Sequence, residues 1–255
     1  MMKRVVIKVG TAVLTQGEEL AFSRLKNLVE LIAKLKMKKN LEVILVSSGA
    51  VGSGYTTLKL DKSNLVNKQT LAAIGQPKLM KTYQEYFEEF GINIAQMLFT
   101  AYDFDSRRRS KNARNVMQTL LANNIVPIIN ENDVISTDEL IGDNDQLAAY
   151  VTHYFEADIL AILTDIDGYY NKNPREFEDA QLQKIVTNIS SEELNKAPSA
   201  NSQFATGGIV TKLKAADFLM QKNIPMYLSS GFDLTNAYDF LLYDEHKSGT
   251  LFIAK

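Results

Sequence analysis

The sequence contains no cysteine, and its 255 residues include only two histidines, His153 and His246. The lack of cysteine excludes disulfide bonds, thiolate zinc sites and a cysteine nucleophile, and it suits a reducing compartment. We therefore expect a cytoplasmic protein. Two histidines do not favour a histidine-built metal centre, so a divalent cation would sit on carboxylates and substrate phosphates, as Mg²⁺ prefers.

An excess of one charge sign is also missing. Lys and Arg total 28, Asp and Glu total 30, and the formal net charge is −2. A broad basic face for nucleic acid is therefore not predicted. The one dense basic run, Arg107–Arg109 with Lys111, is typical of a solvated face or a local anion contact. No run of about 18 apolar residues occurs, so we expect no membrane span.

Short β-branched runs alternate with amphipathic stretches along the first part of the chain. This alternation predicts an α/β fold, a three-layer αβα sandwich with a mostly parallel central sheet. Pro77 falls within the second helical stretch, where we expect a break or a kink. The predicted strands are Arg4–Val9, Leu41–Val46, Ile92–Phe99, Ile125–Ile129 and Ile159–Leu163, and the predicted helices are Phe22–Lys39, Val66–Phe90, Ser110–Asn123 and Asp145–Phe155.

The second half of the chain continues the pattern. Leu182–Ile189 reads as a further strand, for which a hairpin is one option, and Ile209–Lys222 as an amphipathic helix. Pro225–Leu228 and Thr250–Ala254 read as closing strands. No repeat, low-complexity segment or Pro/Ser linker interrupts the chain. We therefore expect one domain over residues 1–255, with a soft division near residue 155.

Unusual residues follow the predicted strands, where open α/β sheets bind ligands. Lys8 lies inside an apolar strand that ends at Gly10, and a buried lysine is costly unless it meets an anion. A lysine that snorkels from the strand end explains it equally well. The next strand leads into Ser47–Gly54, whose order G-x-x-G-x-G differs from the dinucleotide-binding fingerprint. Its glycines suit either an anion-binding turn or a surface turn.

Clusters of polar residues follow the later strands. Asn130–Asp133 and Gly142–Asp145 flank one loop, and together they indicate a polar pocket more than isolated caps and turns. Thr164 and Asp165 end another strand. The segment Thr206–Lys212 combines glycine, hydroxyl and lysine before a helix, which suits a triphosphate or a simple glycine turn.

Together these segments resemble the amino acid kinase family, and the resemblance runs from Lys8 to the closing Gly249–Phe252. Each segment is a weak signal alone, but their joint order at strand ends makes a specific match. Ser47–Ala50 separates the chain from branches that look like H-G-G-G or G-G-G-N there. Aspartokinases resemble this segment more closely, but they usually carry a regulatory extension that we do not expect here, so the resemblance favours the branch that phosphorylates L-glutamate. Many members of that branch carry a carboxyl-terminal PUA module, which we expect to be absent because the sequence ends at Lys255.

The resemblance implies phosphoryl transfer from ATP, with Mg²⁺ held mainly by the phosphates rather than by protein ligands. Lys8 and Lys212 would hold the phosphates, and Asp145 would organise the two lysines without acting as a base. The amino half, about 1–155, would bind the amino acid and the carboxyl half, about 156–255, the nucleotide. The expected nucleotide contacts are Lys8, Gly10, Thr164, Asp165, Thr206, Gly207, Gly208, Ile209, Val210, Thr211 and Lys212.

A free α-amino acid needs a complementary site. Its α-ammonium group calls for a carboxylate, for which Asp133 is the candidate. Its α-carboxylate calls for hydroxyl, amide and backbone donors, which Ser48, Gly49 and Asn144 offer.

The resemblance further implies L-glutamate as the acceptor, proline as a feedback inhibitor acting near Tyr55–Lys68, and a homo-oligomer, either a dimer or a tetramer. Two alternatives stay open. One is an amino acid kinase that acts on aspartate, carbamate or N-acetylglutamate. The other is a non-catalytic amino-acid sensor with a kinase fold, against which the presence of Lys8, Lys212 and Asp145 argues.

Overall fold

The structure is a computed structural model that describes residues 2–136, 144–174, 176–195 and 208–255. Its centre is one eight-stranded sheet with the strand order β5-β6-β4-β1-β7-β9-β10-β8. All neighbouring strands are parallel except β9 and β10, which are antiparallel. The strands are β1 (Arg4–Val9), β4 (Glu42–Ser47), β5 (Ile94–Phe99), β6 (Val126–Glu131), β7 (Ile159–Thr164), β8 (Ile185–Val186), β9 (Met226–Ser230) and β10 (Thr250–Phe252).

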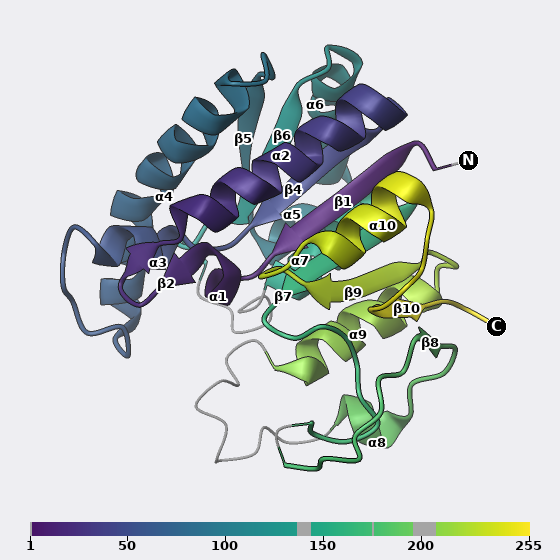
Figure 1. Cartoon of the computed structure of the whole chain (residues 1–255). Helices are drawn as coiled ribbons and strands as arrows, with labels where there is room; N and C mark the ends of the chain where they lie inside the picture. Colours follow the sequence, from purple (N-terminus) through teal and green to yellow (C-terminus); the bar gives the residue numbers. More distant parts are fainter. Residues whose placement is uncertain (1, 137–143, 175, 196–207) are drawn as a thin grey trace.

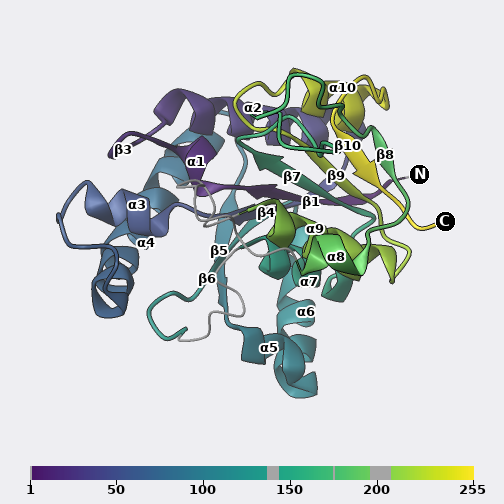
Figure 2. The same cartoon turned by 90° about the horizontal axis from the view of Figure 1, so that it is seen from below.

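Helices cover both faces of this sheet (Figures 1 and 2). A small antiparallel pair, β2 (Thr15–Gln16) and β3 (Glu19–Leu20), lies outside it. The helices are α1 (Thr11–Leu14), α2 (Phe22–Lys39), α3 (Ala50–Tyr55), α4 (Leu65–Glu88), α5 (Ala101–Asp105), α6 (Arg107–Ala122), α7 (Asn144–Tyr154), α8 (Ser191–Leu194), α9 (Ile209–Met220) and α10 (Thr235–Tyr243).

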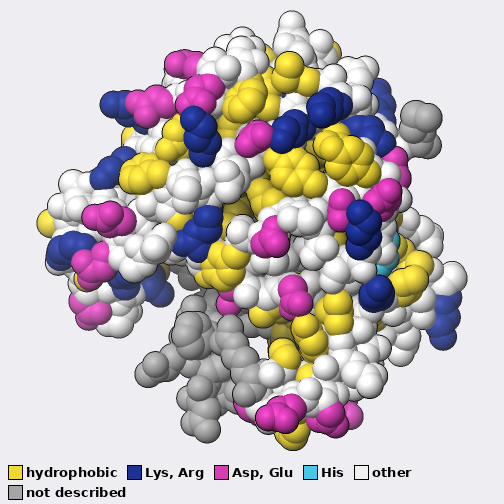
Figure 3. All heavy atoms as spheres, viewed as in Figure 1, with side chains coloured by type: hydrophobic (Ala, Val, Ile, Leu, Met, Phe, Trp, Pro, Cys, Tyr) yellow, Lys and Arg dark blue, Asp and Glu magenta, His cyan; other side chains and the backbone are white. Residues whose placement is uncertain are grey.

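Side-chain alternation along the strands divides the interior into two cores. In β1, Val5, Ile7 and Val9 belong to the cluster that packs against α2, α4 and α10. Val6 belongs to the opposite cluster, which packs against α6, α7 and α9. The expected three-layer αβα sandwich is therefore confirmed. On the face covered by α2 and α10, cationic and anionic side chains are interspersed (Figure 3).

The strand order places a crevice at the carboxyl end of β1. The chain moves from β1 to β4 on one side and later returns to β7 on the other. Such a reversal is the position where open α/β sheets bind ligands. Because β1 pairs with both β4 and β7, strands from the two predicted halves of the chain join in one sheet.

Two glycines hold α3 against α4. A Cβ atom on Gly54 would lie 1.9 Å from the Leu71 carbonyl oxygen, and one on Gly75 would lie 1.8 Å from the Ala50 carbonyl oxygen. Only glycine therefore permits this approach. The contact fixes the start of α3, where Gly49 takes φ 102°, beside the carboxyl end of the sheet.

Most predicted elements of the first half are found, with ends shifted by a few residues. A break or a kink was expected at Pro77, and the break is wrong, because α4 continues through this residue. The strand predicted at Leu182–Ile189 shrinks to β8, which pairs in parallel with β10 and not in a hairpin; Leu182 itself forms an isolated antiparallel bridge with Tyr170. The short helices α1, α3, α5 and α8, the helix α10 and the β2–β3 pair were not predicted. No helix in the described ranges is both long and apolar enough to cross a membrane.

Candidate active site

Lys8 points from the central strand toward the amino end of α7. Alternation along β1 places Lys8 on the same face as Val6, which packs in the core beneath α7 and α9. Its side chain is 3% exposed, and its Nζ atom lies 2.5 Å from Oδ1 of Asp145. Asp145 belongs to the first turn of α7 and is completely buried. Lys8 is thus an ion-paired lysine and does not snorkel to solvent.

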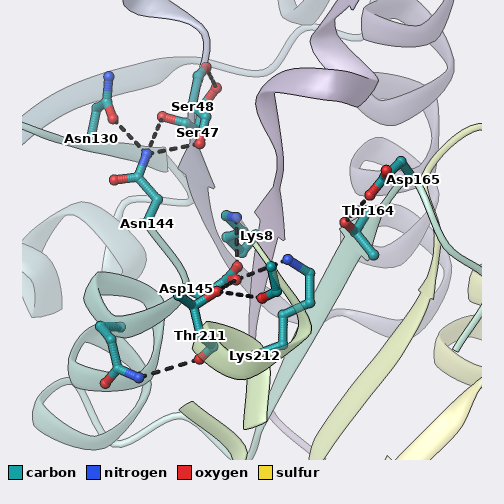
Figure 4. Close-up of polar contacts among 12 residues, drawn as sticks. Lys8, Ser47, Ser48, Asn130, Asn144, Asp145, Thr164, Asp165, Thr211 and Lys212 are labelled. Carbon is teal, nitrogen blue, oxygen red and sulfur yellow. Dashed lines mark hydrogen bonds and ion pairs between the residues drawn. The ribbon is translucent and has the colours of Figure 1, made fainter. Parts of the chain in front are cut away.

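A second lysine reaches the same carboxylate from α9. The Nζ atom of Lys212 lies 3.0 Å from Oδ2 of Asp145, and Lys212 is also 3% exposed. The hydroxyl of Thr211 lies 3.0 Å from the same oxygen. Gln146 donates to the Thr211 carbonyl at 3.3 Å, which ties α7 to α9. Figure 4 shows Lys8 and Lys212 converging on the Asp145 carboxylate from two different elements.

This arrangement suits a polyanion. Burial of charged groups is costly unless each is paired, and here two ammonium groups bind separate oxygens of one carboxylate. The amino ends of α7 and α9 meet at the same place, and backbone N–H groups at helix starts favour anions. Phosphate oxygens can therefore enter between two preformed cations and two helix ends.

A set of amides and hydroxyls lies beside the lysine pair, at the ends of β4 and β6. The Asn144 side-chain nitrogen donates to Asn130 Oδ1 at 2.8 Å and to Ser48 Oγ at 3.0 Å, with the Ser47 carbonyl at 3.4 Å (Figure 4). The Ser47 hydroxyl in turn lies 2.8 Å from the hydroxyl of Tyr83 on α4. Since both Asn144 amide hydrogens serve these bonds, its side-chain oxygen is the atom left to accept a ligand.

Two carboxylates lie at the carboxyl end of β6, one in its last residue and one just after it. Glu131 is 8% exposed and accepts a hydrogen bond from the Ser136 hydroxyl. Asp133 lies in the turn after the strand. Burial, together with the nearby charge of Glu131, raises the pKa of Asp133 to about 6. A ligand ammonium group would relieve both effects, because it neutralises the partly buried charge.

Thr164 and Asp165 lie apart from these two clusters, at the end of β7 (Figure 4). The Thr164 hydroxyl donates to Asp165 Oδ1 at 3.0 Å. Gly10 lies next to β7, because its N–H donates to the Leu163 carbonyl at 3.1 Å. These residues therefore lie on the β7 side of the crevice.

The remaining predicted site residues divide into two groups. Gly49 begins α3, Gly208 caps α9, and Ile209 and Val210 form its first turn. Thr206 and Gly207 lie outside the described residues. Asn130 was not assigned a role from the sequence, although its position near the end of a buried strand could have indicated one. Gln76, which contacts Asn130, was not assigned a role either.

The described residues contain no group of three or more His, Cys, Asp or Glu that could hold a metal ion. The donors at hand are hydroxyls, amides, the lysine-paired Asp145 and the separate carboxylates of Glu131, Asp133 and Asp165. Such a set fits Mg²⁺ only if substrate phosphates supply most ligands, and this mode of binding stays a prediction.

Comparison with known proteins agrees with this geometry. The family model described as the amino acid kinase family matches residues 3–230. A protein of Wolinella succinogenes named glutamate 5-kinase is 55% identical over 99% of this chain and 98% of its own length. A Thermoanaerobacter protein of the same name is 42% identical, and the match covers 98% of this chain and 68% of that protein.

Solved structures show the same fold at low sequence identity. Carbamate kinase from Giardia lamblia, bound to AMP-PNP, superposes with a TM-score of 0.69 at 18% identity, and the match covers 100% of this chain and 99% of that one. The fold, the paired lysines and the family match agree. The chain belongs to the amino acid kinase family. Within that family it belongs with the glutamate 5-kinases, which match it along nearly its whole length.

Proposed function

We propose that this protein transfers the γ-phosphoryl group of ATP to the γ-carboxylate of L-glutamate, which yields γ-glutamyl phosphate and ADP, the first step of proline biosynthesis. The relatives named glutamate 5-kinase support the choice of acceptor. The observation that carries the reaction type is the buried cluster in which Lys8 and Lys212 bind the two oxygens of Asp145.

The chemical problem is charge repulsion between a carboxylate and a polyphosphate. A γ-carboxylate oxygen forms a bond to the γ-phosphorus while the bond from that phosphorus to the β,γ-bridging oxygen breaks, and ADP leaves with the electron pair. No proton moves, because the glutamate carboxylate is already ionised near neutrality. Positioning and charge stabilisation are therefore the whole catalytic task.

Lys8 and Lys212 supply that stabilisation from two sides of the transferred group. Asp145 holds both ammonium groups at fixed positions, so little reorganisation is needed when the phosphates arrive. Mg²⁺ would be held mainly by the substrate phosphates, and it would supply further positive charge to offset the developing negative charge. Thr211 and the start of α9 extend the cradle toward the phosphates.

The amino acid end lies on the amide side of the crevice. Asp133 takes the α-ammonium group, with the Asn144 side-chain oxygen as a second acceptor. Ser48 accepts from Asn144, so its hydroxyl hydrogen can donate to the α-carboxylate. Gly49 adds a backbone donor at the start of α3.

The nucleotide end lies on the carboxyl-half side of the same crevice. Gly10, Thr164 and Asp165 would contact the nucleoside part, and residues 206–212 its phosphates. The Giardia carbamate kinase, whose bound AMP-PNP is an ATP analogue, supports ATP as the donor. Proline inhibition, a homo-oligomeric state and a cytoplasmic location stay predictions.

An acceptor panel tests this function. The purified protein, ATP and Mg²⁺ are incubated with L-glutamate, L-aspartate, N-acetyl-L-glutamate or carbamate, and ADP release is followed while hydroxylamine traps any acyl phosphate. Glutamate should give γ-glutamyl hydroxamate at a kcat/KM at least about 100-fold above that of the other acceptors, as expected when buried polar groups recognise specific substrate groups.

Two outcomes would overturn the proposal. Faster turnover with another acceptor would reassign the substrate within the same family. Tight glutamate binding in a calorimeter with no ADP release would instead favour an amino-acid sensor.

A further inference from the structure

A chain of side-chain amides continues from the proposed glutamate site toward the edge of the sheet. Asn144 on α7 donates to Asn130 on β6 at 2.8 Å, and Asn130 donates to Gln76 Oε1 on α4 at 2.9 Å. Gln76 then donates to Gln96 Oε1 on β5 at 3.0 Å. Three hydrogen bonds thus join α7, β6, α4 and β5, and in each bond the amide nearer Asn144 is the donor.

A backbone group fixes that direction. The Glu131 N–H lies 2.9 Å from Asn130 Oδ1, and a backbone N–H can bond only an oxygen at this position. The Asn130 oxygen therefore faces Glu131 and Asn144, and its NH₂ group must face Gln76. Asn130 is 2% exposed, so an NH₂ group without a partner there would be costly.

Local packing explains why Gln76 is placed to accept a hydrogen bond from the Asn130 NH₂ group. Along β6, Ile128 packs in the core beneath α2 and α4, and alternation places Asn130 on the same face, toward α4. The adjacent Gly75 holds α4 against the Ala50 carbonyl, which leaves no freedom for α4 to shift. Gln76 is therefore held at a fixed distance from the end of β6.

We propose that Gln76 is a positioning residue for the amino acid substrate, an inference that rests on the proposed function. Its side-chain oxygen keeps the Asn130 amide in one orientation. That orientation gives Asn144 an acceptor, and Asn144 in turn presents its oxygen to the ligand and leaves the Ser48 hydroxyl hydrogen free to donate. Without Gln76, the buried NH₂ group of Asn130 loses its acceptor, and any movement of Asn130 toward a new partner weakens the bonds that its oxygen accepts from Asn144 and from the Glu131 N–H.

The ion-paired cluster of Lys8, Asp145 and Lys212 should be little affected by loss of Gln76. Asp145 follows Asn144 in the chain, but its carboxylate binds Lys8, Lys212 and Thr211 from other elements. Loss of Gln76 should therefore separate the two substrates kinetically. Glutamate recognition should weaken, whereas ATP recognition should stay.

Steady-state kinetics of three variants test the proposal. Gln76→Met keeps the length of the side chain but removes its acceptor, and we expect the KM for glutamate to rise about tenfold while the KM for ATP changes less than about twofold. Gln76→Glu restores an acceptor for Asn130, and we expect its glutamate KM to return to within about threefold of the wild-type value. The matched control is Gln84→Met, because Gln84 lies on the same helix but bonds only the exposed Glu88.

The result that overturns the inference is an unchanged glutamate KM in Gln76→Met, or a Gln76→Glu variant as impaired as Gln76→Met. Melting curves establish that each variant is folded. If Gln76→Met does not fold, Gln76→Ala is measured with the same expected rise in the glutamate KM. Gln76→Glu then shows whether an acceptor at this position is sufficient for normal glutamate recognition. Failure of the wild-type protein to phosphorylate glutamate would instead refute the proposed function, so the two failures are distinguishable.

Discussion

The Nζ atom of Lys8 lies 2.5 Å from Oδ1 of Asp145, although 137 positions separate the two residues. The parallel sheet makes this contact possible, because β1 lies at its centre and α7 begins over its carboxyl end. Lys212 reaches the other oxygen of the same carboxylate from a third element, α9. The three side chains therefore form one buried ion-paired cluster.

Asp145→Asn should impair both stability and catalysis. The substitution keeps the shape of the side chain but leaves two buried ammonium groups without their shared charge. Breaking a buried ion pair costs about 3–5 kcal/mol, so urea denaturation should show a loss on that scale. We also expect kcat to fall by a factor of about 100, because the lysines lose their fixed positions.

The control for this variant is Asp179→Asn, which removes an exposed carboxylate from its salt bridge with Lys172. It should change the free energy of unfolding by less than about 1 kcal/mol. A stability loss in Asp145→Asn no larger than in Asp179→Asn would show that the buried cluster is not held by its charges.

Glutamate affinity should fall as the pH drops through about 6. The free protein holds the pKa of Asp133 at about 6, mainly through burial. Only the ionised form can bind the substrate ammonium group, so at pH 5 about a tenth of the protein is competent and the glutamate KM should rise about tenfold. Asp133→Asn should bind glutamate weakly with little pH dependence from 5 to 7, and a wild-type KM that is flat over this range would contradict the assignment.

The same shift gives a stability prediction of definite sign. Asp133 binds its proton more tightly in the folded chain than in the unfolded one, so its favourable contribution is complete below about pH 4 and is lost as the pH rises through about 6. At pH 7.5, Asp133→Asn should therefore be more stable than the wild type, by up to about 3 kcal/mol. The gain should vanish at pH 4. A variant that is less stable at both pH values would refute the burial of this charge.

Gly75→Ala should destabilise the protein strongly. The new methyl group would lie 1.8 Å from the Ala50 carbonyl oxygen and 2.3 Å from the Gly54 nitrogen, so α3 and α4 must separate. We expect a loss of about 3 kcal/mol in urea denaturation. Ala73→Gly at an exposed position of the same helix is the control, and its cost should be near 1 kcal/mol. Equal effects of the two changes would mean that the close helix contact is absent.

The central layer of the fold could be predicted from the sequence because buried parallel strands are short, apolar and β-branched. β1 and β7 show this pattern, and their predicted bounds agree with the structure within one residue. The short helices were missed because a single turn carries too few residues to show a period. The break expected at Pro77 did not occur. A proline inside a helix removes one backbone hydrogen bond, but tertiary packing can keep the helix continuous, as it does in α4.

The candidate site was predictable only as separate segments. Lys8, Asp145 and Lys212 each follow or precede a glycine-rich or polar stretch, but nothing in their spacing says that one carboxylate joins two lysines. That information resides in the strand order. Gln76 was beyond sequence reasoning, because a glutamine on a long helix looks like a surface residue until β6 is placed beside it.

We predict that two ammonium groups from distant parts of the chain, those of Lys8 and Lys212, act together on one phosphoryl group. Pre-steady-state and steady-state ADP release should be measured for Lys8→Ala, Lys212→Ala and the double variant, with saturating glutamate and ATP and with folding checked by melting curves. The account predicts that each single variant lowers kcat by a factor of about 100 or more and that the double variant loses less than the product of the two, as expected for groups that act as a unit. A loss below about threefold in either folded single variant would contradict it.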